Sequence, residues 1–121
     1  MYKILIVEDS SFQRKVIHGA VARDGREIAV APNVPEALQL IEVFKPDIIL
    51  SDILMPGMTG IDMLQKLKEL NITVPVIMIS ADIQEPVRQE CMKLGAIGFI
   101  SKPLAGASLT TLQNILDERL G

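Results

Sequence analysis

Five short apolar runs, each followed by a stretch with helical periodicity, are the feature that most constrains how this chain can fold. The runs lie at residues 3–7, 27–31, 47–51, 76–80 and 98–101, and the second is the weakest of the five. Runs without polar alternation indicate strands that are covered on both faces. We therefore predict an α/β fold with a doubly wound, five-stranded parallel sheet, a (βα)5 three-layer sandwich.

The stretches between these runs have the starts and apolar faces of amphipathic helices. Ser10 can cap the first helix, and Asn33 and Glu36 mark the start of the second, which ends at Pro46. The last helix is expected near residues 108–120. In the first helix we expect a buried stripe at Phe12, Val16 and Ala20, flanked by Ile17 and Val21. The later helices have apolar faces at Ile61, Leu64, Leu67 and Leu70, at Val87, Cys91 and Leu94, and at Leu109, Leu112, Leu116 and Leu120.

Composition and charge narrow the class of protein further. The 121 residues, 49% of them hydrophobic, suit one domain, which we place at residues 1–121. A net charge of −3 argues against direct nucleic-acid binding, and the apolar runs are too short to span a membrane. Cys91 is the single cysteine, so we expect no intrachain disulfide and a cytoplasmic location. The N-terminus is unlike a signal peptide, and Met1 directly before the first strand favours a natural start.

Polar side chains follow four of the five predicted strands. Glu8 and Asp9 follow the first, Asp52 the third, Ser80 ends the fourth, and Lys102 follows the fifth. Each has an ordinary structural explanation when taken alone, such as a strand-end acid that reaches water. Because the carboxyl ends of parallel strands meet at one edge, where open α/β sheets bind their ligands, we expect all five to converge there.

The chemistry of these residue types indicates phosphoryl transfer. Three carboxylates held close together repel one another, and a divalent cation with oxygen ligands, Mg²⁺, relieves that repulsion. With the cation bound, the ammonium of Lys102 is excess positive charge unless a phosphoryl group also enters the site. Ser80 can donate a hydrogen bond to the same oxygens, and aspartate is an effective nucleophile towards phosphoryl groups.

Four segments in order, ILIVEDS, SDILMPGMTG, MISAD and GFISKP, make the chain resemble the receiver domains of two-component response regulators, of the chemotaxis type. The resemblance runs through nearly the whole chain. It implies a flavodoxin-like fold with strand order 2-1-3-4-5. It also implies a phosphorelay signalling protein, not an enzyme beyond its own phosphotransfer and autodephosphorylation.

Residue by residue, the resemblance assigns roles to the edge of the sheet. Asp52 accepts the phosphoryl group from a histidine kinase or a phosphotransfer protein. Asp9 and Asp52 bind Mg²⁺ together with the backbone carbonyl of Leu54, and Glu8 acts through a metal-bound water. Lys102 pairs with the phosphoryl oxygens.

The resemblance also implies a switch. Ser80 moves to hydrogen-bond the phosphoaspartate and Phe99 swings inward to follow it, which remodels the surface of the fourth helix, fifth strand and fifth helix. The peptide before Pro103 is expected to be cis. The partner is then a downstream target protein or an output domain outside this chain, and a phosphorylation-dependent homodimer is a further expectation.

Three competing functions would each require different residues at or near these positions. A phosphate-independent interaction module would lack one of Asp9, Asp52 or Lys102, and an aspartyl phosphatase would carry a second Asp where Leu54 stands. A flavodoxin-like cofactor carrier would need a phosphate-binding loop after the first strand. Leu54 and Asp82 flank the path of the attacking water, so we expect an autodephosphorylation rate unlike that of receivers with polar residues at these two positions.

Overall fold

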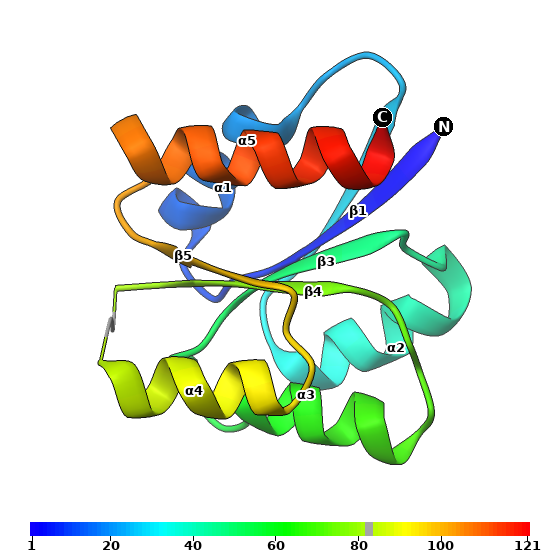
Figure 1. Cartoon of the computed structure of the whole chain (residues 1–121). Coiled ribbons are helices and arrows are strands. Elements are labelled where there is room, and N and C mark those ends of the chain that lie inside the picture. Colours follow the sequence, from blue (N-terminus) through cyan, green and yellow to red (C-terminus); the bar gives the residue numbers. More distant parts are fainter. Residues whose placement is uncertain (82–83) are drawn as a thin grey trace.

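The computed structural model describes residues 1–81 and 84–121 and shows a sheet with helices on both faces (Figure 1). Asp82, expected beside the path of the attacking water, lies outside the described residues. The strands are β1 (Tyr2–Val7), β2 (Arg26–Ala31), β3 (Ile48–Asp52), β4 (Val76–Ser80) and β5 (Gly98–Ser101). The helices are α1 (Ser11–Val21), α2 (Val34–Phe44), α3 (Gly60–Glu69), α4 (Glu85–Lys93) and α5 (Gly106–Leu120).

All four strand pairings are parallel, and the strand order is β2-β1-β3-β4-β5. Helices α1 and α5 cover one face of the sheet, and α2, α3 and α4 cover the other (Figure 1). The predicted fold class and strand order are therefore confirmed. This order places β1, β3 and β4 side by side in the middle of the sheet, so the ends of these three strands are direct neighbours.

The core consists of two apolar layers, one on each face of the sheet. One layer packs under α2, α3 and α4 and includes Met63, Met78 and Cys91. The other packs under α1 and α5 and is aliphatic, with Ile6 and Leu116 among its members. Strands β3 and β4 are buried along their whole length, as expected for strands covered on both faces.

Side-chain caps begin the first two helices where the sequence predicts them. The Ser10 hydroxyl accepts a hydrogen bond from the Gln13 amide at 3.2 Å, and the Asn33 side chain accepts one from the Glu36 amide at 2.9 Å. Among the described residues, no helix is both long enough and apolar enough to cross a membrane.

The expected buried stripe of α1 is wrong at Phe12, whereas its expected flanks Ile17 and Val21 are confirmed. Phe12 is 70% exposed, whereas Ile17 and Val21 are buried in the core. Phe12 lies in the first turn of the helix. Leu70, expected on the buried face of α3, is 51% exposed because the helix ends at Glu69.

Candidate functional site

The predicted polar residues meet at the carboxyl edge of the sheet. Glu8 directly follows β1, Lys102 directly follows β5, and Ser80 is the last residue of β4. Asp52, expected just after its strand, is the last residue of β3 and pairs in register with Ile79. The strand therefore holds the Asp52 backbone in the sheet while its side chain reaches the edge.

Three carboxylates form a cluster at this edge. Glu8, Asp9 and Asp52 each offer an oxygen, and these oxygens all lie within 4.8 Å of one another. Glu8 and Asp52 are buried, at 1% and 7% exposure, whereas Asp9 is exposed and keeps the cluster open to solvent. An oxygen-only donor set with one open side fits a hydrated hard cation such as Mg²⁺.

Lys102 bridges the two buried carboxylates. Its ammonium nitrogen lies 3.0 Å from Oε2 of Glu8 and 3.3 Å from Oδ2 of Asp52. The three acids carry three negative charges when ionised, and one ammonium offsets only one of them. The cluster therefore keeps a net negative charge that a divalent cation would balance.

Burial raises the pKa of Glu8 above its ordinary value of 4.5. The hydrogen bond from Lys102 opposes this effect, and the nearby charge of Asp52 adds to it. The raised pKa of this carboxyl therefore follows mainly from its burial, and the negative charge of Asp52 contributes less.

The Asp52 carboxylate and the loop after it are held by short contacts. Oδ1 of Asp52 accepts a hydrogen bond from the Ile53 amide at 2.8 Å, and the Ser51 hydroxyl donates to the Asp52 carbonyl at 2.8 Å. The Gly60 amide donates to the Ile53 carbonyl at 2.9 Å. A Cβ on Gly60 would overlap the Asp52 carbonyl oxygen and press on Met78, so only glycine fits here.

Sequence reasoning missed Gly60 and also Arg14. Nη1 of Arg14 donates to the backbone carbonyls of Glu8 and Asp9, at 2.8 and 3.1 Å. An arginine in the second turn of a helix is usually a solvated residue, so its position alone carried no signal. Neither the close approach at Gly60 nor this bridge can be recognised without the tertiary structure.

The remaining predicted residues lie around the cluster. Ser80 is fully buried, and its carbonyl accepts a hydrogen bond from the Lys102 amide at 2.8 Å. Phe99 is half-buried on β5 and packs against the core layer under α2, α3 and α4. Leu54 is 61% exposed. The peptide between Lys102 and Pro103 is cis, as the resemblance implied.

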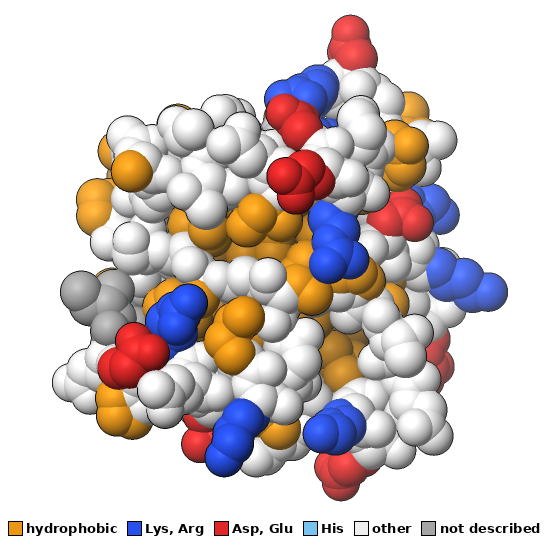
Figure 2. All heavy atoms as spheres, viewed as in Figure 1, with side chains coloured by type: hydrophobic (Ala, Val, Ile, Leu, Met, Phe, Trp, Pro, Cys, Tyr) orange, Lys and Arg blue, Asp and Glu red, His pale blue; other side chains and the backbone are white. Residues whose placement is uncertain are grey.

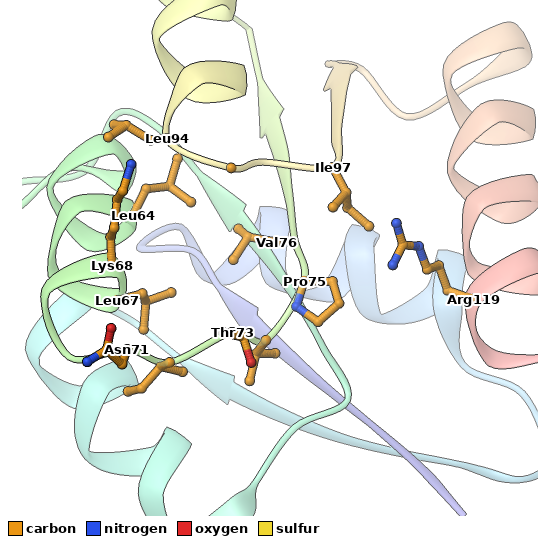
Figure 3. A pocket seen from close by; sticks show the side chains of 13 residues that line it. Leu64, Leu67, Lys68, Asn71, Thr73, Pro75, Val76, Leu94, Ile97 and Arg119 are labelled. Carbon is orange, nitrogen blue, oxygen red and sulfur yellow. The ribbon is translucent and has the colours of Figure 1, made fainter.

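A pocket of about 370 Å³ lies at the opposite edge of the sheet, away from the carboxylates. It is lined by Pro75, which directly precedes β4, and by Ile97, which directly precedes β5. Lys68 and Arg119 lie on its two sides (Figure 3). Figure 2 shows apolar side chains in a hollow between the two helical layers, with basic side chains nearby. This pocket shares no residue with the acidic cluster.

Comparisons with known proteins agree with this geometry. The family model described as response regulator receiver domain matches residues 4–114. The chain is 36% identical to a chemotaxis protein CheY of Thermotoga maritima, over 84% of this chain and 85% of that protein. Its fold matches the Francisella response regulator 1452 receiver domain with a TM-score of 0.85 and 31% identity, over the full length of both chains.

The chain is also similar to part of longer proteins. The chain is 41% identical to a protein-glutamate methylesterase/protein-glutamine glutaminase of Treponema denticola, over 98% of this chain and 33% of that protein. The chain therefore spans about a third of the length of this curated relative.

Proposed function

The chain belongs to the response regulator receiver domain family, and we propose that its Asp52 is the residue that accepts the phosphoryl group, within one receiver domain at residues 1–121. The observation that carries this proposal is the bridge from Lys102 to Glu8 and Asp52, inside a three-carboxylate cluster. The ammonium 3.3 Å from the buried Asp52 supports this proposal, because it could stabilise the phosphoryl oxygens during nucleophilic attack by the carboxylate.

The proposed step transfers phosphorus from a phosphohistidine of the donor protein. A carboxylate oxygen of Asp52 attacks the phosphorus, the P–N bond breaks, and its electron pair stays on the imidazole nitrogen, which takes up a proton. The product is an acyl phosphate on Asp52. Lys102, which pairs with the carboxylate before the reaction, then pairs with the phosphoryl oxygens.

Asp9 and Asp52, with the Leu54 carbonyl, are the proposed ligands of Mg²⁺, and Glu8 would hold one of its waters. When bound, the ion supplies positive charge that stabilises the transferring phosphoryl oxygens. The protein keeps the three carboxylates close together, and the single ammonium of Lys102 offsets only part of their negative charge.

After transfer, we expect Ser80 to donate its hydroxyl hydrogen to a phosphoryl oxygen. Ser80 lies next to Ser101 in the pairing of β4 with β5, two residues from Phe99. A shift at Ser80 therefore has a short path to Phe99 and to the surface of α4, β5 and α5.

The partners follow from this chemistry and from the relatives. The donor is a histidine kinase or a phosphotransfer protein. The signal then passes either to a separate target, as expected for a chain like the chemotaxis protein CheY, or to an output domain, as in the longer methylesterase relative. Assembly of two phosphorylated copies remains a further proposal.

Two alternatives are less well supported. A phosphate-independent interaction module has no need of the bridging Lys102 or of the clustered carboxylates. An aspartyl phosphatase has no general acid here, because Leu54 occupies the position two residues after Asp52.

Acetyl phosphate labelling tests the proposal directly. Wild type and Asp52→Asn are incubated with acetyl phosphate, with Mg²⁺ or with EDTA, and intact mass is measured. We expect one phosphate adduct that requires Mg²⁺ and is absent from Asp52→Asn. An adduct that persists in Asp52→Asn would place the acceptor elsewhere. Absence of any adduct with acetyl phosphate and with a donor histidine kinase would favour the phosphate-independent module.

A further inference from the structure

We propose that Arg14 is a positioning residue that fixes the turn between β1 and α1, so that the carboxylates of Glu8 and Asp9 face a divalent cation. This inference rests on the proposed magnesium-dependent function and deepens it. It concerns a residue that touches neither the phosphoryl group nor the ion.

One nitrogen of Arg14 makes both contacts. Nη1 lies 2.8 Å from the Glu8 carbonyl oxygen and 3.1 Å from the Asp9 carbonyl oxygen. A guanidinium nitrogen of this kind carries two hydrogens, so it can donate one to each carbonyl. The two carbonyls belong to successive residues, and their common donor therefore fixes the orientation of the peptide between the two acids.

The same turn is fixed at its other polar groups. The Glu8 amide donates to the Ala31 carbonyl on β2 at 3.0 Å, and the Ser10 amide donates to Oε1 of Glu8 at 3.3 Å. These two bonds hold groups on Glu8 and Ser10, and the Arg14 contacts hold the backbone carbonyls of Glu8 and Asp9 in addition. Loss of the bridge removes this restraint from the Glu8 and Asp9 carbonyls, and Asp9 is the exposed member of the carboxylate cluster.

Magnesium binding is sensitive to such rotation. The ion demands near-ideal octahedral geometry with ligand distances of about 2.0–2.1 Å. A carboxylate that samples several orientations must be ordered when the ion binds, and the entropy lost then weakens the affinity.

Charge and positioning predict opposite effects when Arg14 is replaced. A positive charge beside three carboxylates repels Mg²⁺, so its removal should strengthen binding if charge alone matters. If Arg14 acts by positioning the turn, its removal should weaken binding. The sign of the change therefore separates the two roles.

Lys15 is a matched control for charge. It is the next residue of α1, is exposed, and lines the same shallow surface pocket as Arg14. In residues 1–81 and 84–121, no hydrogen bond or ion pair involves the Lys15 side chain. Lys15→Gln thus removes the same charge from the same part of the helix without touching the turn.

Isothermal titration calorimetry with MgCl₂ at fixed ionic strength tests the inference on wild type, Arg14→Gln, Arg14→Lys and Lys15→Gln. We expect Arg14→Gln to bind Mg²⁺ about 10-fold more weakly, as is typical for loss of an outer-shell partner. Lys15→Gln should bind as wild type does or slightly more tightly. Arg14→Lys, which keeps the charge but not the planar guanidinium, should fall between wild type and Arg14→Gln.

Equal or tighter binding by Arg14→Gln would overturn the inference, as would absence of magnesium binding by wild type. Circular dichroism checks that each variant is folded, and Arg14→Lys provides the comparison if Arg14→Gln is not. The proposed function is tested separately by the mass adduct on Asp52. Weakened binding in Arg14→Gln without any adduct on wild type would keep the positioning role and reject the phosphoacceptor role.

Discussion

Glu8 is a buried carboxyl, and its ionisation lowers the free energy of unfolding of the protein. Its pKa is raised above 4.5, mainly by burial. Below pH 4.5 the group is protonated in the folded and unfolded states alike, so its contribution to stability is fully present. Above pH 4.5, Glu8 ionises more easily in the unfolded protein than in the folded protein. The contribution of Glu8 to stability is therefore lost as pH rises through the raised pKa of the folded state.

We therefore expect the wild type to lose stability relative to Glu8→Gln as pH rises from 4.5 towards neutrality in EDTA. Urea unfolding at a series of pH values measures the free energy of unfolding of both proteins. Glu118→Gln, at an exposed position of α5, is the control and should follow the wild type. Parallel curves for wild type and Glu8→Gln would contradict the prediction.

Gly60 is required by close approach rather than by its backbone angles. In Gly60→Ala the new Cβ would meet the Asp52 carbonyl oxygen, which belongs to the sheet and cannot move far. We expect a loss of about 2 kcal/mol or more in the free energy of unfolding, measured in urea. Gly19→Ala is the matched control, because a Cβ there meets nothing within 4 Å, and it should stabilise α1 by about 0.5–1 kcal/mol. Equal effects of the two substitutions would contradict the close-packing argument.

At the scale of the element, the face of α1 that is buried determines which substitutions should lower stability. Ile17 is buried at 1% exposure and Phe12 is 70% exposed. Ile17→Ala should therefore cost about 2–4 kcal/mol in urea unfolding, because it leaves a cavity in the core. Phe12→Ala should change stability by less than about 0.5 kcal/mol. The opposite ranking would mean that the originally expected stripe, with Phe12 inward, is correct.

Two arginines, Arg23 after α1 and Arg26 at the start of β2, contact the end of α5. Oδ1 of Asp117 lies 2.6 Å from Arg23 and 3.3 Å from Arg26. The Arg26 side chain is only 4% exposed and also donates to the Val21 carbonyl at 3.1 Å. Loss of Asp117 would leave this buried charge without its carboxylate partner.

We expect Asp117→Ala to lower the free energy of unfolding by about 1–2 kcal/mol, less than for a fully buried pair because Asp117 itself is half exposed. Glu118→Ala is the control, since it removes a neighbouring negative charge from the same last turn of α5. Thermal or urea unfolding of the two variants measures the difference. Similar stabilities would mean that the contacts to Asp117 contribute nothing measurable.

At the scale of the whole molecule, the proposed switch connects Asp52 to one side of the sheet. Ser80 and Phe99 lie on neighbouring strands, whereas β2 lies at the far edge of the sheet, beyond β1. We expect phosphorylation to change amide hydrogen exchange mainly in α4, β5 and α5 of the wild type. In Ser80→Ala, Asp52 should still be labelled while the change at β5 is largely lost. Changes of equal size in β2 would contradict this route.

The sequence predicted the features that depend on local pattern. Apolar runs and capped helical stretches are read residue by residue, so the sheet, its helices and the caps at Ser10 and Asn33 followed from the chain alone. The meeting of Glu8, Asp52 and Lys102 also followed, because a parallel sheet brings the carboxyl ends of its strands to one edge.

Tertiary packing decided what local pattern leaves open. Helix α1 has two overlapping apolar series, and only contact with the sheet selected Ile17 and Val21 over Phe12. The bridge from Arg14 depends on how far one long side chain reaches across a turn, and the need for Gly60 depends on an approach of two backbones. The physical reason is that periodicity determines which residues are available for burial, whereas distances between separate segments arise only when the layers pack together.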